Sequence, residues 1–309
     1  LYLKDVVTEF KSQVKILFDL LMESAEKHQN VLLPGYTHLQ IAMPSSFGMW
    51  FSAYAETLID DITMLNAAFK IVDQNPLGSA AGYGSSFPIN RTFTTKELGF
   101  ETLKFNSVAA QMSRGKSEKT VAFAMSSVAA TLAKFSMDVC LYMSQNFDFI
   151  SLPSHLTTGS SIMPHKKNPD VFELIRGKCN KIQALPYEIT LITNNLPSGY
   201  HRDFQLLKEG LFPAIQNLKA CLDIAIFAIK DIKVKDNILA DKKYDYLFTV
   251  DALNEMVVAG MPFRDAYKAV AEQLENGTFV SPKETKHTHE GSINNLCLEE
   301  IKQKMKSAF

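Results

Sequence analysis

Residues 117–147 read SEKTVAFAMSSVAATLAKFSMDVCLYMSQNF, and the spacing of their apolar side chains decides the fold. These side chains recur at alternating steps of four and three, at Val121, Met125, Val128, Leu132, Phe135, Val139 and Tyr142. Such spacing places them on one face of an α-helix that packs against other helices. At a rise of 1.5 Å per residue, the segment would form about 45 Å of helix. The stretch therefore predicts a bundle of unusually long helices.

Four other segments keep the same rhythm. The first should run to about His28, and the second should begin after Pro44 and continue to about Phe69. A further helix should start at Pro169 and be kinked by Pro186, because proline cannot donate to the helical ladder. The last carries its apolar stripe from Leu211 to Ile229, and segments typical of strands are nearly absent. We therefore predict an all-α fold, with a long-helix bundle over residues 1–230.

The remainder of the chain, residues 231–309, has shorter apolar patterns and more polar residues. Turn signals at 259–263 and at Asn276-Gly277 indicate a small C-terminal helical domain. The basic stretch 283–289 is expected to be an exposed loop or a disordered segment rather than a metal site. The chain opens at Leu1 in helical rhythm and without methionine, so we expect further chain upstream.

Composition excludes several classes of function. The chain has 309 residues, 46% of them hydrophobic, and a formal net charge of -1, so no global basic field favours nucleic acid or an anionic membrane. No apolar run is expected to reach the roughly 18 residues that a membrane span requires. Four widely spaced cysteines indicate reduced thiols and a cytoplasmic protein. No motif for a cofactor or a metal is apparent.

Residues 158–170, TGSSIMPHKKNPD, form the loop with the densest polar chemistry. Asn168, Pro169 and Asp170 are typical of a helix N-terminus, where Asn caps free amides and Asp complements the helix dipole. The loop would bring its hydroxyls and Lys166 beside a positive helix end, which suits a carboxylate or a phosphate. An ordinary surface loop with a good cap is the alternative.

Two other loops carry polar groups between helices. Residues 33–40, LPGYTHLQ, present Thr37 and His38 on a turn rich in glycine and proline. Residues 196–208 present Tyr200, Gln205 and Lys208, and the spacing of the last two would place them on one helical face. A structural loop histidine and a capped inter-helix turn are the respective alternatives. The glycine-rich stretch 76–84, PLGSAAGYG, could cradle an anion but lacks the P-loop spacing.

Gly159-Ser-Ser-Ile-Met-Pro-His-Lys-Lys-Asn-Pro169 resembles the signature of the fumarase/aspartase superfamily. Within it, Pro34 to Gln40, Leu196 to Lys208 and Gly260 to Arg264 are similar to the argininosuccinate lyase family, and the resemblance extends over essentially the whole chain. It implies reversible β-elimination of argininosuccinate to arginine and fumarate in arginine biosynthesis, without a cofactor. It also implies a homotetramer in which each active site takes residues from three chains.

The resemblance also implies roles for individual residues. Ser160 would be the catalytic base, with Ser161 less favoured, and His38 would donate a proton to the leaving group or organise it, with Glu173 as its acidic partner. The opposite assignment of Ser160 and His38 stays open. Substrate contacts would be made by Thr37, Lys166, Asn168, Tyr200, Gln205 and Lys208, and more weakly by Lys167 and Arg202.

The chain departs from the family pattern at several places. The family's N-terminal domain would precede Leu1, residues 41–43 lack the usual polar pair, residues 106–119 rearrange a charged run, and His165 replaces the more frequent Gln. The amino-acid end of the substrate would then be held differently, which admits an acylated argininosuccinate. Adenylosuccinate lyase and a non-catalytic, crystallin-like structural protein are the two alternatives.

Overall fold

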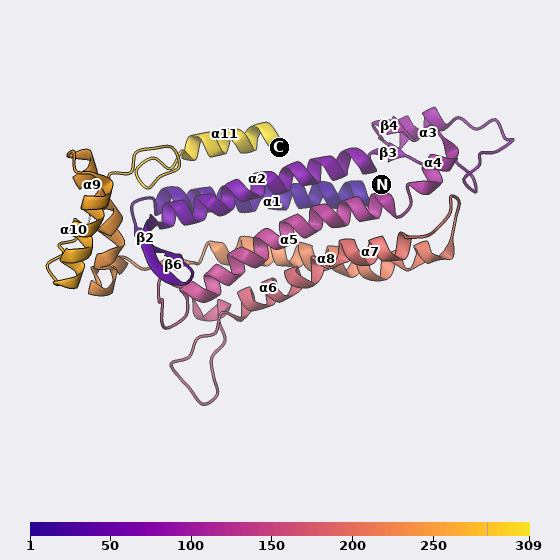
Figure 1. The fold of residues 1–309 in the computed structure, drawn as a ribbon. Coiled ribbons are helices and arrows are strands. Elements are labelled where there is room, and N and C mark those ends of the chain that lie inside the picture. The colour runs from indigo at the N-terminus through magenta and orange to yellow at the C-terminus, as the bar shows by residue number, and fades with distance from the viewer. Residues whose placement is uncertain (283) are drawn as a thin grey trace.

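The computed structural model describes residues 1–282 and 284–309, so Lys283 of the predicted loop 283–289 lies outside the described residues. Figure 1 shows an elongated bundle of helices. Its long members are α1 (Tyr2–Lys27), α2 (Phe47–Val72), α5 (Lys116–Tyr142) and α8 (Leu207–Ile229). Two shorter helices, α6 (Asp170–Ile182) and α7 (Leu185–Thr193), follow one another along the bundle. The predicted all-α fold is confirmed.

The buried stripes are those that the apolar spacing predicts. Phe10, Val14 and Leu17 of α1 are buried against α2 and α8, while Val121, Met125 and Val128 of α5 are buried against α2 and α6. The ring of Trp50 stacks on that of Phe135, with centroids 5.5 Å apart. Because each helix buries one long face, the core is continuous along the bundle.

Two predicted helix boundaries differ from the structure. Helix α5 ends at Tyr142 rather than near Phe147, since residues 144–148 form a turn closed by the amide of Phe147 and the carbonyl of Ser144. Pro186 does not kink one helix. It lies at the start of α7, after a break that follows Ile182. A proline is tolerated there because the first helical amides need no intrahelical acceptor.

Short strands occupy positions that the sequence pattern does not reveal. Strands β1 (Leu32–Thr37) and β2 (Gln40–Ser46) form an antiparallel hairpin. The pair β3 (Gln74–Asn75) and β4 (Thr102–Leu103) is parallel, and β5 (Ile150–Ser151) pairs antiparallel with β6 (Lys233–Val234). The predicted loop over residues 33–40 is therefore mostly strand, and only His38 and Leu39 form the turn.

A small subassembly closes one end of the bundle. It contains α3 (Arg91–Glu97), α4 (Ser107–Met112) and the β3–β4 pair. The Arg91 guanidinium donates hydrogen bonds to the carbonyls of Leu77, Lys104 and Phe105, at 2.8–2.9 Å. One side chain thus fastens the glycine-rich stretch 76–84 to the segment that leads into α4.

The opposite end carries α9 (Thr249–Val258) and α10 (Phe263–Glu275), which share a small core of Leu253, Ala266 and Val270. Helix α11 (Leu298–Ala308) instead returns along α2, where the Asn66 amide donates to the carbonyl of Ala308 at 2.6 Å. The division into residues 1–230 and 231–309 stays a prediction, and α11 packs on the bundle across it.

Two helical stretches, Ser107–Tyr142 and Arg202–Ile229, contain 18-residue windows that are long and apolar enough to cross a membrane. The expectation that no segment reaches this length is therefore wrong. The first window is 61% buried inside the chain and the second 39%. Core helices of soluble proteins pass the same test, so the windows are weak evidence for a span.

Candidate active site

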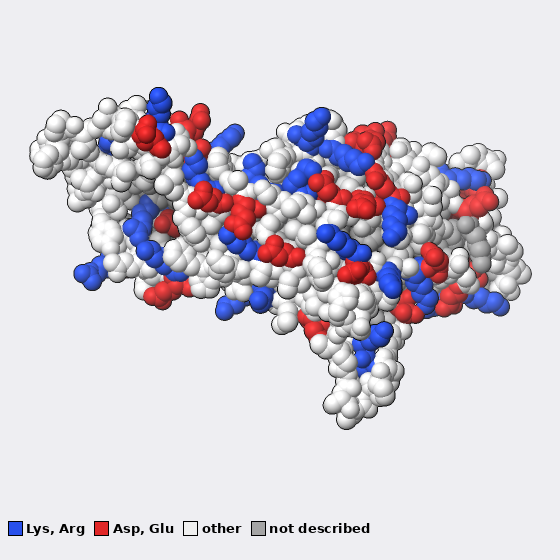
Figure 2. Space-filling model, turned by 180° about the vertical axis from the view of Figure 1, so that it is seen from behind, with Lys and Arg blue, Asp and Glu red and all other residues white. Residues whose placement is uncertain are grey.

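The loop 158–168 projects from the bundle ahead of α6, as Figures 1 and 2 show. Its two ends are joined by the backbone of Thr158 and Asn168, whose amides and carbonyls pair at 3.2 and 2.8 Å. Near the base of the loop, Ser160 is half-buried, while Lys166 is exposed. The loop is thus closed at its base, and Figure 2 shows no charged side chain at its tip. Ile162, in the middle part of the loop, is 82% exposed.

Within this loop the Ser160 hydroxyl oxygen accepts two backbone hydrogen bonds. The amides of Ile162 and Met163 donate to Oγ at 3.4 and 3.2 Å. The amide of Lys166 in turn donates to the carbonyl of Met163 at 3.0 Å, which tightens the turn. Backbone donors aimed at one oxygen stabilise negative charge on it.

The predicted helix cap at Asn168 is wrong. The residue that precedes α6 is Pro169, which has no side-chain cap, and Asp170 is the first residue of the helix. The Asn168 amide nitrogen instead donates to the hydroxyl of Thr158 at 3.4 Å. The backbone pairing with Thr158 holds Asn168 in an extended ladder, so its side chain turns toward Thr158 and not toward the helix amides.

Glu173 lies in the first turn of α6, and its side chain is exposed. Its amide donates to the carbonyl of Pro169 at 3.1 Å, so the position of the residue is fixed by the helix start. The carboxylate is therefore available to groups outside this helix.

Thr37 and His38 lie at the exposed tip of the β1–β2 hairpin. Thr37 pairs with Gln40, and the two residues between them, His38 and Leu39, have φ angles of 52° and 58°. Positive φ at both central residues defines a type I′ turn, which usually contains Asn and Gly. Side chains with a Cβ atom are strained there, on the order of 1 kcal/mol each. Strain retained at an exposed tip is typical of functional positions.

The hairpin also brings its strands unusually close. A Cβ atom at Gly35 would lie 2.9 Å from the carbonyl oxygen of Met43, at the point where the register shifts. Glycine is thus needed for the bulge that precedes the tip. Among the described residues the sheet has only these two strands, so Pro34 and Pro44, which face each other, both lie on edge strands, where proline is tolerated.

The third group of predicted site residues is Tyr200, Gln205 and Lys208, and two of them contact each other within the chain. The Gln205 amide nitrogen donates to the hydroxyl of Tyr200 at 3.0 Å. Gln205 ends a 3₁₀ helix, Arg202–Gln205, and Lys208 lies in the first turn of α8, so the two do not share one regular helix as predicted. All three side chains are exposed, as is that of Arg202.

The three groups do not meet in one chain. Figure 1 shows the β1–β2 hairpin at one end of the bundle and the connection from α7 to α8 at the other, while the 158–168 loop projects sideways ahead of α6, nearer the end with the hairpin. Helix α5 alone, with 27 residues, separates those ends by about 40 Å. Among the described residues, no hydrogen bond or ion pair links one group to another.

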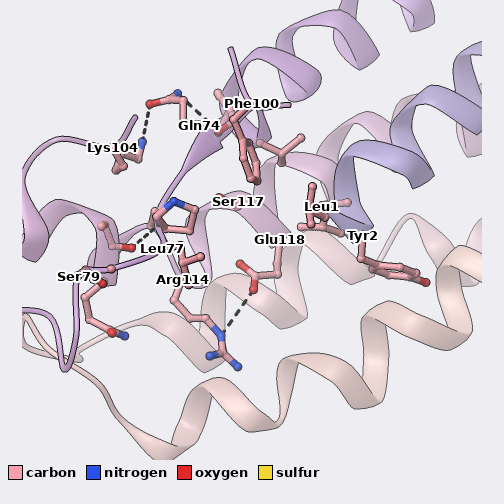
Figure 3. A pocket seen from close by; sticks show the side chains of 18 of the residues that line it. Leu1, Tyr2, Gln74, Leu77, Ser79, Phe100, Lys104, Arg114, Ser117 and Glu118 are labelled. Atoms are coloured by element: carbon pink, nitrogen blue, oxygen red, sulfur yellow. Dashed lines mark hydrogen bonds and ion pairs between the residues drawn. The ribbon is translucent and has the colours of Figure 1, made fainter. Parts of the chain in front are cut away.

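Sequence reasoning missed the surroundings of Lys208. It lines a cavity of about 220 Å³ together with Arg114, Glu118 and Phe204. An adjoining cavity of about 580 Å³, seen in Figure 3, shares Arg114 and Glu118 and is also lined by Gly78, Ser79 and Lys104. The Arg114 guanidinium lies 3.8 Å from the Glu118 carboxylate. The rearranged charges at 106–119 and the glycine-rich stretch were the signals available in the sequence.

Comparison with known proteins defines the class first. The family model described as Lyase matches residues 1–184. A solved structure of EDDS lyase in complex with formate aligns with a TM-score of 0.82 at 19% identity, covering 99% of this chain and 68% of that chain. A class II fumarase from Schistosoma mansoni aligns at 0.74 with 18% identity, over 98% and 68%. The chain therefore belongs to the family described as Lyase, and its fold is the helical bundle that it shares with these two structures.

Sequence relatives narrow this class. Argininosuccinate lyase from Parabacteroides distasonis is 57% identical over 100% of this chain and 69% of its own length. The argininosuccinate lyases of Bacteroides fragilis and Xylella fastidiosa are 57% and 36% identical, over 97% and 98% of this chain and 67% and 68% of their own lengths. The chain therefore belongs to the argininosuccinate lyases, a family of carbon–nitrogen lyases.

Proposed function

We propose that this protein releases fumarate from argininosuccinate, with Ser160 as the base that removes the proton next to the substrate carboxylate. The observation that carries the assignment is the pair of backbone amides, those of Ile162 and Met163, that donate to Ser160 Oγ. A serine hydroxyl is a weak base, so its alkoxide requires such donors, the Lys166 charge and exclusion of water.

The elimination would start at the Ser160 alkoxide. The alkoxide takes the proton, and the C–H electron pair delocalises into the carboxylate as an enediolate. Lys166 and Asn168, beside the start of α6, favour that charge more than the ground-state carboxylate. The pair collapses to the carbon–carbon double bond of fumarate, the C–N bond breaks, and its electrons stay on the guanidino nitrogen. His38, with Glu173 as its partner, supplies a proton there; the opposite direction of proton transfer is the alternative that the same groups permit.

The remaining contacts serve the two ends of the substrate. Thr37 adjoins His38 at the hairpin tip, while Tyr200, Gln205 and Lys208 form an exposed polar group near the cavity with Arg114. A cation and two hydrogen-bonding side chains suit a carboxylate and an amino group.

We further propose a homotetramer in the cytoplasm whose sites combine loops from different subunits. Large apolar side chains remain exposed along the bundle, which favours burial between copies. They include Phe123, Leu174, Tyr187, Leu191 and Phe227, each at least half exposed. The four cysteines are free thiols, in keeping with a reducing compartment.

The test follows fumarate absorbance with full-length protein on argininosuccinate, on N-acylated argininosuccinate and on adenylosuccinate. Ser160→Ala should reduce kcat by at least about 10³-fold. Ser161→Ala, the matched control at the neighbouring residue, should keep most of the wild-type kcat. Turnover of adenylosuccinate alone would overturn the substrate assignment. An equal loss of kcat in the two serine variants would contradict the assignment of Ser160, rather than Ser161, as the base.

The shared site has its own test. Ser160→Ala and His38→Asn proteins, each inactive alone, are mixed under conditions that exchange subunits. If loops from different chains complete one site, hybrid tetramers regain part of the activity, because some sites contain neither substitution. A fully active monomer by light scattering would contradict the assembly.

A further inference from the structure

Thr158, Asn168 and Asp170 tie together the two ends of the loop that carries Ser160. Besides the backbone pairing of Thr158 with Asn168, the Thr158 hydroxyl donates to Asp170 Oδ2 and accepts from the Asn168 amide. One hydroxyl is thus shared between the residue that ends the loop and the residue that begins α6. We call these three residues the Thr158 clasp.

The clasp joins a projecting loop to a fixed support. Asp170 is the first residue of α6, which is anchored by the buried Phe172 and Ile175. Among the described residues, the hydrogen bonds of residues 159–167 stay inside the loop. The orientation of Ser160 and Lys166 relative to the bundle therefore depends on the clasp.

The clasp also fixes the position of the negatively charged Asp170 carboxylate. Asp170 lies two residues from Asn168 and four from Lys166, the groups assigned to an anionic substrate. A carboxylate free to turn toward that substrate would repel it and the enediolate. The Thr158 hydroxyl holds Asp170 at the base of the loop and occupies one of the two Asn168 amide protons, which leaves the other for the substrate carboxylate.

We propose that Thr158 and Asp170 are positioning residues for the lyase reaction, which hold the Ser160 loop and Asn168 in their reactive orientation. This inference rests on the proposed function. Their side chains bond one another and Asn168, and we assign neither of them a step in the proton transfer, so their loss should affect the transition state more than substrate binding.

The test replaces the hydroxyl with a methyl group of similar shape in full-length protein. Thr158→Val should lower kcat by about 10- to 100-fold and change KM by less than about threefold. Thr158→Ser, which keeps the hydroxyl, should recover to within about threefold of wild type. The matched control is Thr157→Val, because the Thr157 hydroxyl bonds only locally, to the carbonyl of Pro153 at 3.4 Å.

Hydrogen exchange gives a readout that does not depend on turnover. In Thr158→Val the amides of Thr158 and Asn168 should exchange faster, while those of α6 stay unchanged. Wild-type protein inactive on argininosuccinate would overturn the proposed function, and the exchange would still report on the clasp. The positioning role would be overturned if the wild-type protein is active but Thr158→Val and Thr157→Val have equal kcat values. It would also be overturned if the amides of Thr158 and Asn168 exchange at the wild-type rate in Thr158→Val.

Discussion

The Ser127 hydroxyl of α5 donates to the carboxylate of Asp61 on α2, with Oγ and Oδ1 2.5 Å apart. Asp61 is 1% exposed, and no described residue offers its second oxygen a hydrogen bond. Burial therefore raises the pKa of Asp61, against the opposing effect of the Ser127 and Thr131 hydroxyls. An ionisable group has been retained between two core helices at a cost in stability.

The first prediction concerns the pH dependence of that cost. A carboxyl whose pKa is raised by folding binds its proton more tightly in the folded state, so stability falls as pH rises above the unfolded pKa of about 4. Asp61→Asn should therefore increase the free energy of unfolding by about 1–3 kcal/mol near pH 8. The gain should shrink as the pH approaches 4, as measured by urea unfolding.

Asp60→Asn is the matched control, because Asp60 is an exposed neighbour on the same helix. It should change stability by less than about 0.5 kcal/mol at every pH. An Asp61→Asn effect that does not vary with pH would show that the pKa of Asp61 is the same in the folded and unfolded states.

A second prediction concerns Asp138, whose Oδ2 accepts hydrogen bonds from Trp50 Nε1 at 3.1 Å and from the Tyr54 hydroxyl at 2.6 Å. Burial and this carboxylate raise the pKa of Tyr54. Asp138→Ala would leave two buried donors unpaired and should cost about 2–4 kcal/mol. Trp50 is the single tryptophan of the chain, so its fluorescence reports unfolding directly.

The comparison variant is Asp148→Asn, which removes an exposed ion pair with Lys235 and keeps a side chain that tolerates the positive φ of 50° at this position. Its loss should stay below about 1 kcal/mol. Equal midpoints for the two variants would mean that the Asp138 hydrogen bonds add nothing to stability.

How far the sequence predicts this structure depends on the range of the interactions. Helices α1, α2 and α5 follow from local spacing, because each buries a single face. The β1–β2 hairpin does not, since Leu32 and Leu33 break strand alternation and two prolines pair across it. Asn168 has the sequence position of a cap, yet its side chain bonds Thr158, ten residues away. The motifs predict which residues form the site. How far apart these residues lie along the bundle depends on long-range packing, which the sequence motifs do not encode.

A third prediction compares two glycines in helices. A Cβ atom at Gly48 would lie 2.7 Å from both Gln29 Cα and Leu296 Cδ1, where α2 passes close to the end of α1. Because the first contact is with backbone, Gly48→Ala should destabilise the chain by about 1–3 kcal/mol. Gly177, within α6, has no neighbour within 4 Å of an added Cβ. Gly177→Ala should stabilise it by up to about 1 kcal/mol, and the same sign for both changes in thermal unfolding would contradict the packing.

The last prediction concerns the order in which the cysteines react. Cys179 and Cys221 are buried between α6 and α8, and their thiols contact one another. The hydrogen bond with Cys221, together with burial, raises the pKa of Cys179. Alkylation proceeds through the thiolate and needs access, so neither should react in folded protein. Cys297, half-buried at the start of α11, should react first in timed iodoacetamide labelling read by mass spectrometry.

In the same experiment, the labelling rate of Cys140 tests the effect of thiol ionisation rather than that of solvent access. It is half-buried, and burial raises its pKa to about 11. At pH 8 about one thiol in a thousand would be ionised, so Cys140 should label slowly and about tenfold faster per pH unit until the pH approaches 11. Cys297→Ser should remove the fast phase and leave the slow one. Labelling of Cys179 at the Cys297 rate in folded protein would show that α6 and α8 separate readily, because access to that thiol requires their interface to open.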